Sequence, residues 1–338
     1  MDWSLDRHLQ RRMALTLLAL AALTTAFATS ITVFLAWGVE WFSGLFGLQL
    51  PFEHRLALGG VMTLIVGIII LWRALRKDAA ETFDAFPVGP AAYPDLHATV
   101  TRIAQIADIP TPSVYITDRE RPLAMTTGIS VDDTKLVVST GLLDALDADE
   151  LDAVVAHEVA HIKNRDATVM TLVELPLASA RNLGRTLRSM GHFALLVVAI
   201  CSYAFWGVGR LLVASLSRSR EIAADRGASA LLGDSAALAS ALKTLDDDVP
   251  SAPDRDAREA ALASLSIVPD SNEERGPKLT YEGRRPILWG PRLRIRRVHH
   301  RLYERYLRSA LATHPATDER IDHLRTVERD QTRTTSRR

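Results

Sequence analysis

The sequence predicts an α+β protein that is mainly α-helical and integral to a membrane, with about four membrane segments. Two observations lead to this class. Long uncharged apolar runs lie near the N-terminus, and shorter stretches with helical or strand-like periodicity follow them. We therefore expect a membrane anchor at residues 1–80, a second domain at 81–330 and a disordered tail at 331–338.

The composition excludes several classes of protein. The 338 residues carry 40 basic and 40 acidic side chains, so the formal net charge is zero and we expect no nucleic-acid partner. The single cysteine, Cys201, rules out an intramolecular disulfide and a cysteine-rich metal site.

The two N-terminal apolar runs have the length of membrane helices. Residues 13–37 and 56–72 hold no charged side chain, and a spanning helix needs roughly 17–25 apolar residues. A secretory signal peptide is the alternative, since Ala26-Phe27-Ala28 resembles a cleavage site. The first run continues well past that site, which favours two retained transmembrane helices in the lipid bilayer.

Basic residues indicate how these helices are oriented. They cluster on the two outer flanks, while the loop between the helices has one: Arg7, Arg11, Arg12, Arg73, Arg76 and Lys77 against Arg55. Cytoplasmic flanks carry an excess of Lys and Arg. We therefore expect a multi-pass protein of the cell (plasma or inner) membrane, with the N-terminus and the second domain in the cytoplasm.

The second domain begins with a helix and a small sheet. Apolar residues recur at helical spacing from Asp95 to Ala107, and Pro110 and Pro112 end that pattern. Three short β-rich pieces follow at 114–117, 124–129 and 135–140.

A helix carrying two histidines comes next, in the stretch AHEVAHIKNRD. Asp147 and Glu150 have the spacing of a capping box, which starts the helix. His157 and His161 stand four residues apart, so both imidazoles lie on one helix face. The alternative is a helix with solvated His and Glu side chains, because short motifs also arise by chance.

The residue types in this helix suit zinc hydrolysis. Two histidines supply two of the three protein ligands of a catalytic zinc, and Glu158 can take a proton from the activated water. No third histidine follows soon after, since positions 164 and 167 are Asn164 and Ala167. The best remaining ligand is Glu221 in SRSREIAADRGA, with Asp225 on the same helix face able to orient a liganding histidine.

Three motifs in order resemble the HtpX-type membrane zinc metalloproteases, a group that includes the CAAX prenyl endopeptidases. They read AVVAHEVAHIKNRD, SRSREIAADRGA and THPATDERI. The resemblance implies a gluzincin-like peptidase domain built of an active-site helix and a small sheet, with one Zn²⁺ per chain. It implies zinc ligands at His157, His161 and Glu221, with Glu158 as general base and acid and Asp225 supporting a histidine.

The same resemblance assigns further residues. His314 would stabilise the oxyanion, and Arg320 would tie its segment to the active-site helices; a turn histidine before Pro315 is the alternative for His314. The substrate would lie along a strand made of Ala124, Met125, Thr126, Thr127 and Gly128. Relatives often have asparagine where this sequence has Leu123, which puts a polar substrate contact in doubt.

A membrane hairpin should separate the ligands. His161 and Glu221 must meet at one ion, so residues 168–216 cross the membrane twice or not at all. Residues 193–216 are long enough to span, whereas 168–180 are not, and Arg181, Arg185 and Arg188 would fall outside. An interfacial hairpin therefore stays open beside a third and fourth span. We also expect an irregular insertion at about 244–299.

We thus expect a membrane-anchored zinc endopeptidase. The resemblance implies that it cuts unfolded or misfolded membrane polypeptides at the cytoplasmic face, in protein quality control. A CAAX-type prenyl protease and an inactive membrane scaffold or sensor are the alternatives.

Overall fold

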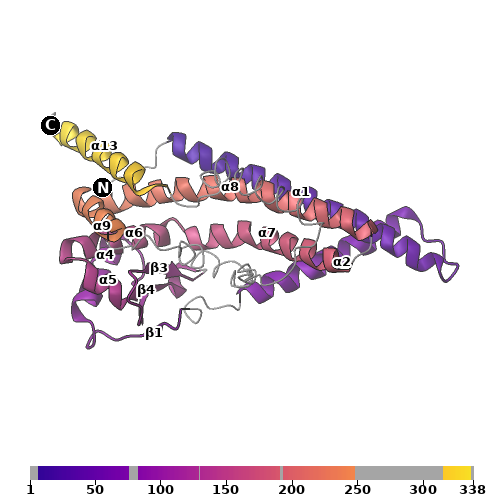
Figure 1. Ribbon diagram of the computed structural model, residues 1–338, viewed down its shortest axis with the longest axis horizontal. Coiled ribbons are helices and arrows are strands. Elements are labelled where there is room, and N and C mark those ends of the chain that lie inside the picture. Colours follow the sequence, from indigo (N-terminus) through magenta and orange to yellow (C-terminus); the bar gives the residue numbers. More distant parts are fainter. Residues whose placement is uncertain (1–6, 76–82, 129, 191–192, 248–314, 336–338) are drawn as a thin grey trace, which may run out of the picture.

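The computed structural model describes residues 7–75, 83–128, 130–190, 193–247 and 315–335. Short helices and a small sheet gather at one end of an elongated molecule, and long helices extend from there to the other end (Figure 1). The expected class, mainly helical with a small sheet and apolar membrane helices, is confirmed.

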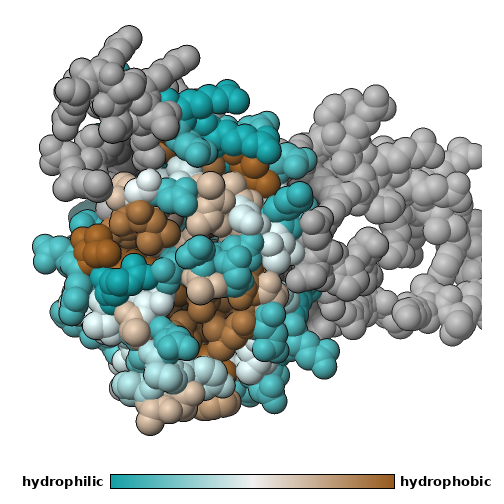
Figure 2. Space-filling model, turned by 90° about the vertical axis from the view of Figure 1, so that its left-hand side faces the viewer, coloured by the Kyte–Doolittle hydropathy of each residue, from teal (hydrophilic) through white to brown (hydrophobic). Residues whose placement is uncertain are grey.

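The long helices carry the apolar surface of the molecule. Within the described residues, three helices are long and apolar enough to cross a membrane: α1 (Arg7–Gly44), α2 (Phe52–Leu75) and α8 (Phe193–Leu232). Helix α1 packs closely on α2, where a Cβ added to Gly59 would lie 2.6 Å from the Thr32 carbonyl oxygen. The end of the molecule that carries α4, α5 and α9 has a mixed surface, with hydrophilic side chains and smaller hydrophobic patches (Figure 2).

The expected hairpin is formed by α7 (Asp166–Ser189) and α8. Helix α7 contains Pro176 and several charges and is not one of the three apolar candidates among the described helices. It packs along α8, and Arg210 of α8 donates a hydrogen bond of 2.7 Å to the buried Glu174 of α7. Helix α8 is one continuous helix that carries both the apolar run and Glu221, because nothing between them breaks a helix before Gly233 (φ 73°).

The sheet has four strands in the order β1-β2-β4-β3. The strands are β1 (Phe86–Pro87), β2 (Ser113–Thr117), β3 (Ala124–Thr127) and β4 (Lys135–Ser139). Strand β4 pairs parallel with β2 and antiparallel with β3, whose second edge has no partner strand among the described residues. The three predicted β-rich pieces are therefore strands, and β3 lies at the edge.

Helices cover the sheet and enclose the main core. Helix α4 (Pro94–Ala107), predicted from its periodicity, and α6 (Ala148–Lys163) pack together with β2 and β4. A short helix, α5 (Thr140–Ala145), joins β4 to α6. The predicted capping box is present, since the Asp147 side chain accepts from Glu150 N and the Glu150 carboxylate accepts from Asp147 N.

Glu150 also fixes α9 (Ala236–Asp247) on α6. Its Oε1 atom accepts hydrogen bonds from Ser240 Oγ at 2.6 Å and Thr244 Oγ1 at 2.9 Å. The carboxylate is buried, so these bonds replace its lost hydration.

Two predicted boundaries differ from the structure. Helix α9 continues to Asp247, so the expected insertion does not begin at Thr244, and the rest of that insertion lies outside the described residues. Helix α13 (Thr317–Thr335) continues beyond residue 330 into the tail that was expected to be disordered. Its first turns are docked on α8 and α9, and propagation of a formed helix adds one hydrogen bond per residue.

We expect Glu150→Ala to lower the free energy of unfolding by about 2 kcal/mol, because three donors lose a buried acceptor. Thermal unfolding in detergent measures the change. Glu150→Gln, which keeps one acceptor oxygen, should lose less. An alanine variant as stable as the wild type would contradict this role.

Candidate metal centre and active site

Helix α6 presents His157 and His161 from successive turns of one face. Both residues are buried, their Nε2 atoms are 3.1 Å apart and their rings meet edge to face. Glu158, also buried, follows His157 directly. The four-residue spacing on a helix therefore brings both imidazoles to one point, as the sequence indicates.

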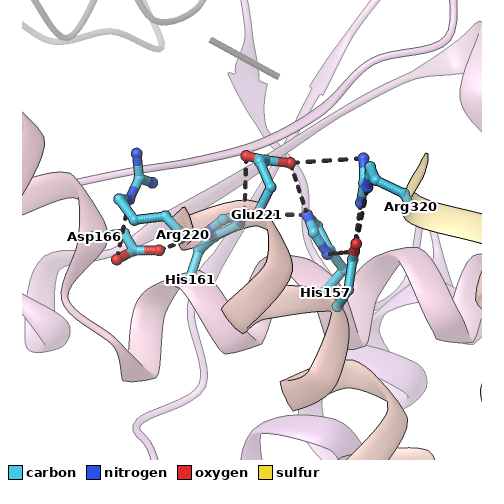
Figure 3. A network of polar contacts seen from close by, with 7 residues as sticks. His157, His161, Asp166, Arg220, Glu221 and Arg320 are labelled. Carbon is cyan, nitrogen blue, oxygen red and sulfur yellow. Dashed lines mark hydrogen bonds and ion pairs between the residues drawn. The ribbon is translucent and has the colours of Figure 1, made fainter. Parts of the chain in front are cut away.

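Glu221 of α8 completes the group. Its Oε2 atom lies 3.7 Å from His157 Nε2, and its Oε1 atom lies 3.7 Å from His161 Nε2 (Figure 3). One ligand atom from each of the three residues lies within 4.8 Å of the others. Tetrahedral zinc with ligands at about 2.1 Å requires ligand atoms roughly 3.4 Å apart. The three side chains therefore fit three of the four positions around one zinc ion, and no other described residue belongs to this ligand group.

The outer nitrogen of His157 faces a buried ion pair. Its Nδ1 atom lies 3.1 Å from Asp225 Oδ1, and Arg320 donates to both Asp225 oxygens, at 2.9 Å from Nε and 2.6 Å from Nη2. Arg320 Nη1 also lies 3.6 Å from Glu221 Oε2. Burial alone would lower the pKa of Arg320. The charge of Asp225 raises it by more, so the pKa lies above its usual value and the guanidinium stays charged. Helix α13 thus reaches the site through Arg320.

The outer nitrogen of His161 faces a second pair that the sequence analysis missed. Asp166 Oδ2 lies 2.6 Å from His161 Nδ1, and Arg220 Nε lies 3.1 Å from Asp166 Oδ1 (Figure 3). Burial raises the pKa of the Asp166 carboxyl, but the charges of Arg220 and His161 outweigh it and hold that pKa below its usual range. Asp166 is thus a carboxylate at neutral pH.

A signal for this pair is visible in the sequence only in part. Asp166 ends the stretch AHEVAHIKNRD, but five residues after His161 it would lie off the histidine face of a continuous helix. Helix α6 instead stops at Lys163, and Arg165 adopts a left-handed conformation with φ 55°. This turn brings Asp166 back to His161.

A pocket of about 1090 Å³, counting the space at its open mouth, contains this group. Strand β3 forms one wall and α9 another, while α6 contributes the metal-binding face. Apart from the metal-binding group, most of the pocket lining is apolar and includes Leu123, Leu142, Val154, Leu238, Leu242 and Leu245. The polar part consists of the histidines, the carboxylates and the two arginines.

The residues expected to guide substrate lie beside this group. Ala124, Met125 and Thr126 line the large pocket, and Thr126, Thr127 and Gly128 line a smaller one that also touches His161. Gly128 has φ 119°, and a Cβ there would collide with the Asp133 carbonyl oxygen. Leu123, in the place of the family's asparagine, lines the large pocket. His314 lies outside the described residues.

Comparisons with known proteins agree with this geometry. The model of a family described as Peptidase family M48 matches residues 90–328. The chain is 33% identical over 289 residues to a protease HtpX homolog of Moorella thermoacetica, covering 79% of this chain and 87% of that protein. It is 30% identical over 335 residues to protease HtpX homolog 1 of Streptomyces coelicolor, covering 94% of this chain and 92% of that protein.

Among solved structures, the crystal structure of S. mikatae Ste24p matches with a TM-score of 0.41 and 15% identity, covering 91% of this chain and 66% of that chain. The assignment rests on the family model and the HtpX homologs rather than on this likeness. The chain belongs to peptidase family M48 and is an HtpX-like membrane metalloprotease.

Proposed function

We propose that the protein is a zinc-dependent endopeptidase that cuts polypeptides at the cytoplasmic face of the cell membrane. The observation that carries this proposal is the group of His157, His161 and Glu221, whose ligand atoms have the spacing of tetrahedral zinc, beside Glu158. One Zn²⁺ per chain follows from the one such group among the described residues.

The residues of the site divide the chemistry between them. When bound, zinc lowers the pKa of water to about 7 and polarises a carbonyl group. Glu158 follows His157 directly on α6 and lines the same pocket. We assign it the transfer of a proton from the attacking water to the leaving amine. Asp225 holds His157 in orientation, and Arg320 holds Asp225.

Strand β3 gives the substrate a place to bind. Three of its residues line the pocket, and none of the described strands pairs with its second edge, so an extended peptide can add to Ala124–Thr127 by main-chain hydrogen bonds. Main-chain pairing requires no particular sequence. The proposed substrates are therefore polypeptides with extended segments, such as misfolded membrane proteins in quality control.

The course of helix α8 supports a site near the membrane. Leu211 is an exposed apolar residue of its candidate span, and Glu221 follows ten residues later, about 15 Å along the helix. We propose that α7 crosses beside α8 as a fourth segment. The charged side chains of α7 have partners on α8: Glu174 pairs with Arg210, Arg181 lies over the ring of Trp206, and Arg188 lies over the ring of Tyr203. The basic flanks of α1 and α2 favour a cytoplasmic site.

We also propose that His314 donates to the oxyanion. It directly precedes Pro315, which is buried, and Arg320 of the following helix reaches the site. A donor aimed at the developing charge is worth about 3 kcal/mol.

We expect Glu158→Gln to abolish cleavage of casein in detergent and to retain zinc, because the amide cannot take the proton. Equal rates for Glu158→Gln and wild type would exclude this mechanism.

We expect Glu221→Ala to lose zinc, measured by metal analysis after gel filtration. Removal of zinc from the wild type by a chelator should stop cleavage, and added Zn²⁺ should restore it.

The apolar part of the pocket predicts a preference at one substrate position. Val154 lies one turn before His157 on α6, and Leu238, Leu242 and Leu245 of α9 line the same pocket, so this apolar lining suits a bulky aliphatic side chain near the scissile bond. We expect Leu245→Glu to reduce the kcat/KM ratio between matched leucine and alanine peptides about tenfold. Ile106→Glu, an exposed position on α4 away from the pocket, serves as the control. An unchanged ratio in Leu245→Glu would contradict the preference.

A further inference from the structure

We propose that Asp166 and Arg220 form a positioning pair that sets the orientation of His161 and joins the membrane hairpin to the metal centre. This inference rests on the proposed zinc centre. It concerns which residues of this chain hold the second histidine ligand.

The contacts form a chain through buried groups. His161 Nδ1 meets Asp166 Oδ2 at 2.6 Å, and the other oxygen of the same carboxylate meets Arg220 Nε at 3.1 Å. Asp166 is 3% exposed and Arg220 is 6% exposed, so water does not compete for these contacts. With Nδ1 donating to Asp166, the lone pair of Nε2 points toward Glu221, where a metal ligand needs it.

The arrangement repeats that of the other histidine. His157 contacts Asp225, which in turn pairs with Arg320. His161 contacts Asp166, which in turn pairs with Arg220. The two series of contacts differ in the helices that supply them. Arg320 belongs to α13, whereas Asp166 and Arg220 belong to the two arms of the hairpin. The hairpin therefore supplies the third ligand and also fixes the second.

Stability alone does not explain the pair. Removing two charges from water costs several kcal/mol per ion, and a buried ion pair often contributes little net stability compared with apolar residues of similar volume. The left-handed Arg165 is a further local cost in a non-glycine residue. Both features are accounted for if the turn serves to bring a carboxylate to His161.

The Glu174–Arg210 pair offers a matched control. It joins the same two helices at 2.7 Å, and Glu174 lies eight residues from Asp166, about 12 Å farther along α7. Neither residue lines the metal pocket. A variant here tests hairpin integrity without touching His161.

The experiment measures zinc affinity by chelator competition on the full chain in detergent. We expect the Kd for Zn²⁺ to rise about 10–100-fold in Asp166→Ala and less in Asp166→Asn, which keeps an oxygen for the His161 N–H. Arg220→Met should weaken zinc binding and Arg220→Lys should partly restore it. The absorption bands of bound Co²⁺ should shift in Asp166→Ala, and Glu174→Gln should bind zinc as the wild type does.

Two outcomes would overturn the inference alone: wild-type zinc affinity in Asp166→Ala and Asp166→Asn, or an equal loss in Glu174→Gln, which would assign the effect to packing of the hairpin. Asp166→Asn, which changes the shape of the side chain little, covers the case in which Asp166→Ala fails to fold. A wild-type protein that binds no zinc would instead overturn the proposed function, and this inference with it.

Discussion

The structure depends on the meeting of two helices at one point. His157 and His161 come from α6, whereas Glu221 comes from α8, the second arm of the hairpin that follows α6 in the chain. Ligand atoms 3.1–3.7 Å apart leave little room for a shift of α8 along α6, since one residue of helix corresponds to about 1.5 Å. The packing of the long apolar helices therefore decides whether the polar site can exist.

Buried charge explains why several distant segments converge there. Glu221, Asp166 and Asp225 are all buried carboxylates, and each needs a compensating partner. Arg220 and Arg320 supply two positive charges, and the proposed zinc supplies the rest. Because Arg320 comes from α13, the C-terminal helix is part of the electrostatic balance of the centre, and its docking is coupled to that of α8.

Local patterns allowed the sequence to predict much of the site. The capping box of Asp147 and Glu150 and the four-residue spacing of the histidines are properties of a single helix, so they are readable in the chain and present in the structure. Asp166 could not be assigned because its position depends on one left-handed residue, Arg165. The apolar run 193–216 and the stretch SRSREIAADRGA differ in composition, so the sequence alone did not join them, whereas α8 is continuous through both.

The edge of β3 links the fold to the kind of substrate proposed. A free strand edge is an aggregation hazard that proteins usually shorten or cover. Here the strand has four residues, three of them line the metal pocket, and its second edge has no partner among the described strands. A peptide can pair with such an edge only in an extended conformation, which a folded domain does not offer in its helices or central strands. On the proposed function, preference for unfolded chains thus requires no recognition sequence, because it follows from the pairing geometry, and the apolar leucines of α9 add a choice of side chain.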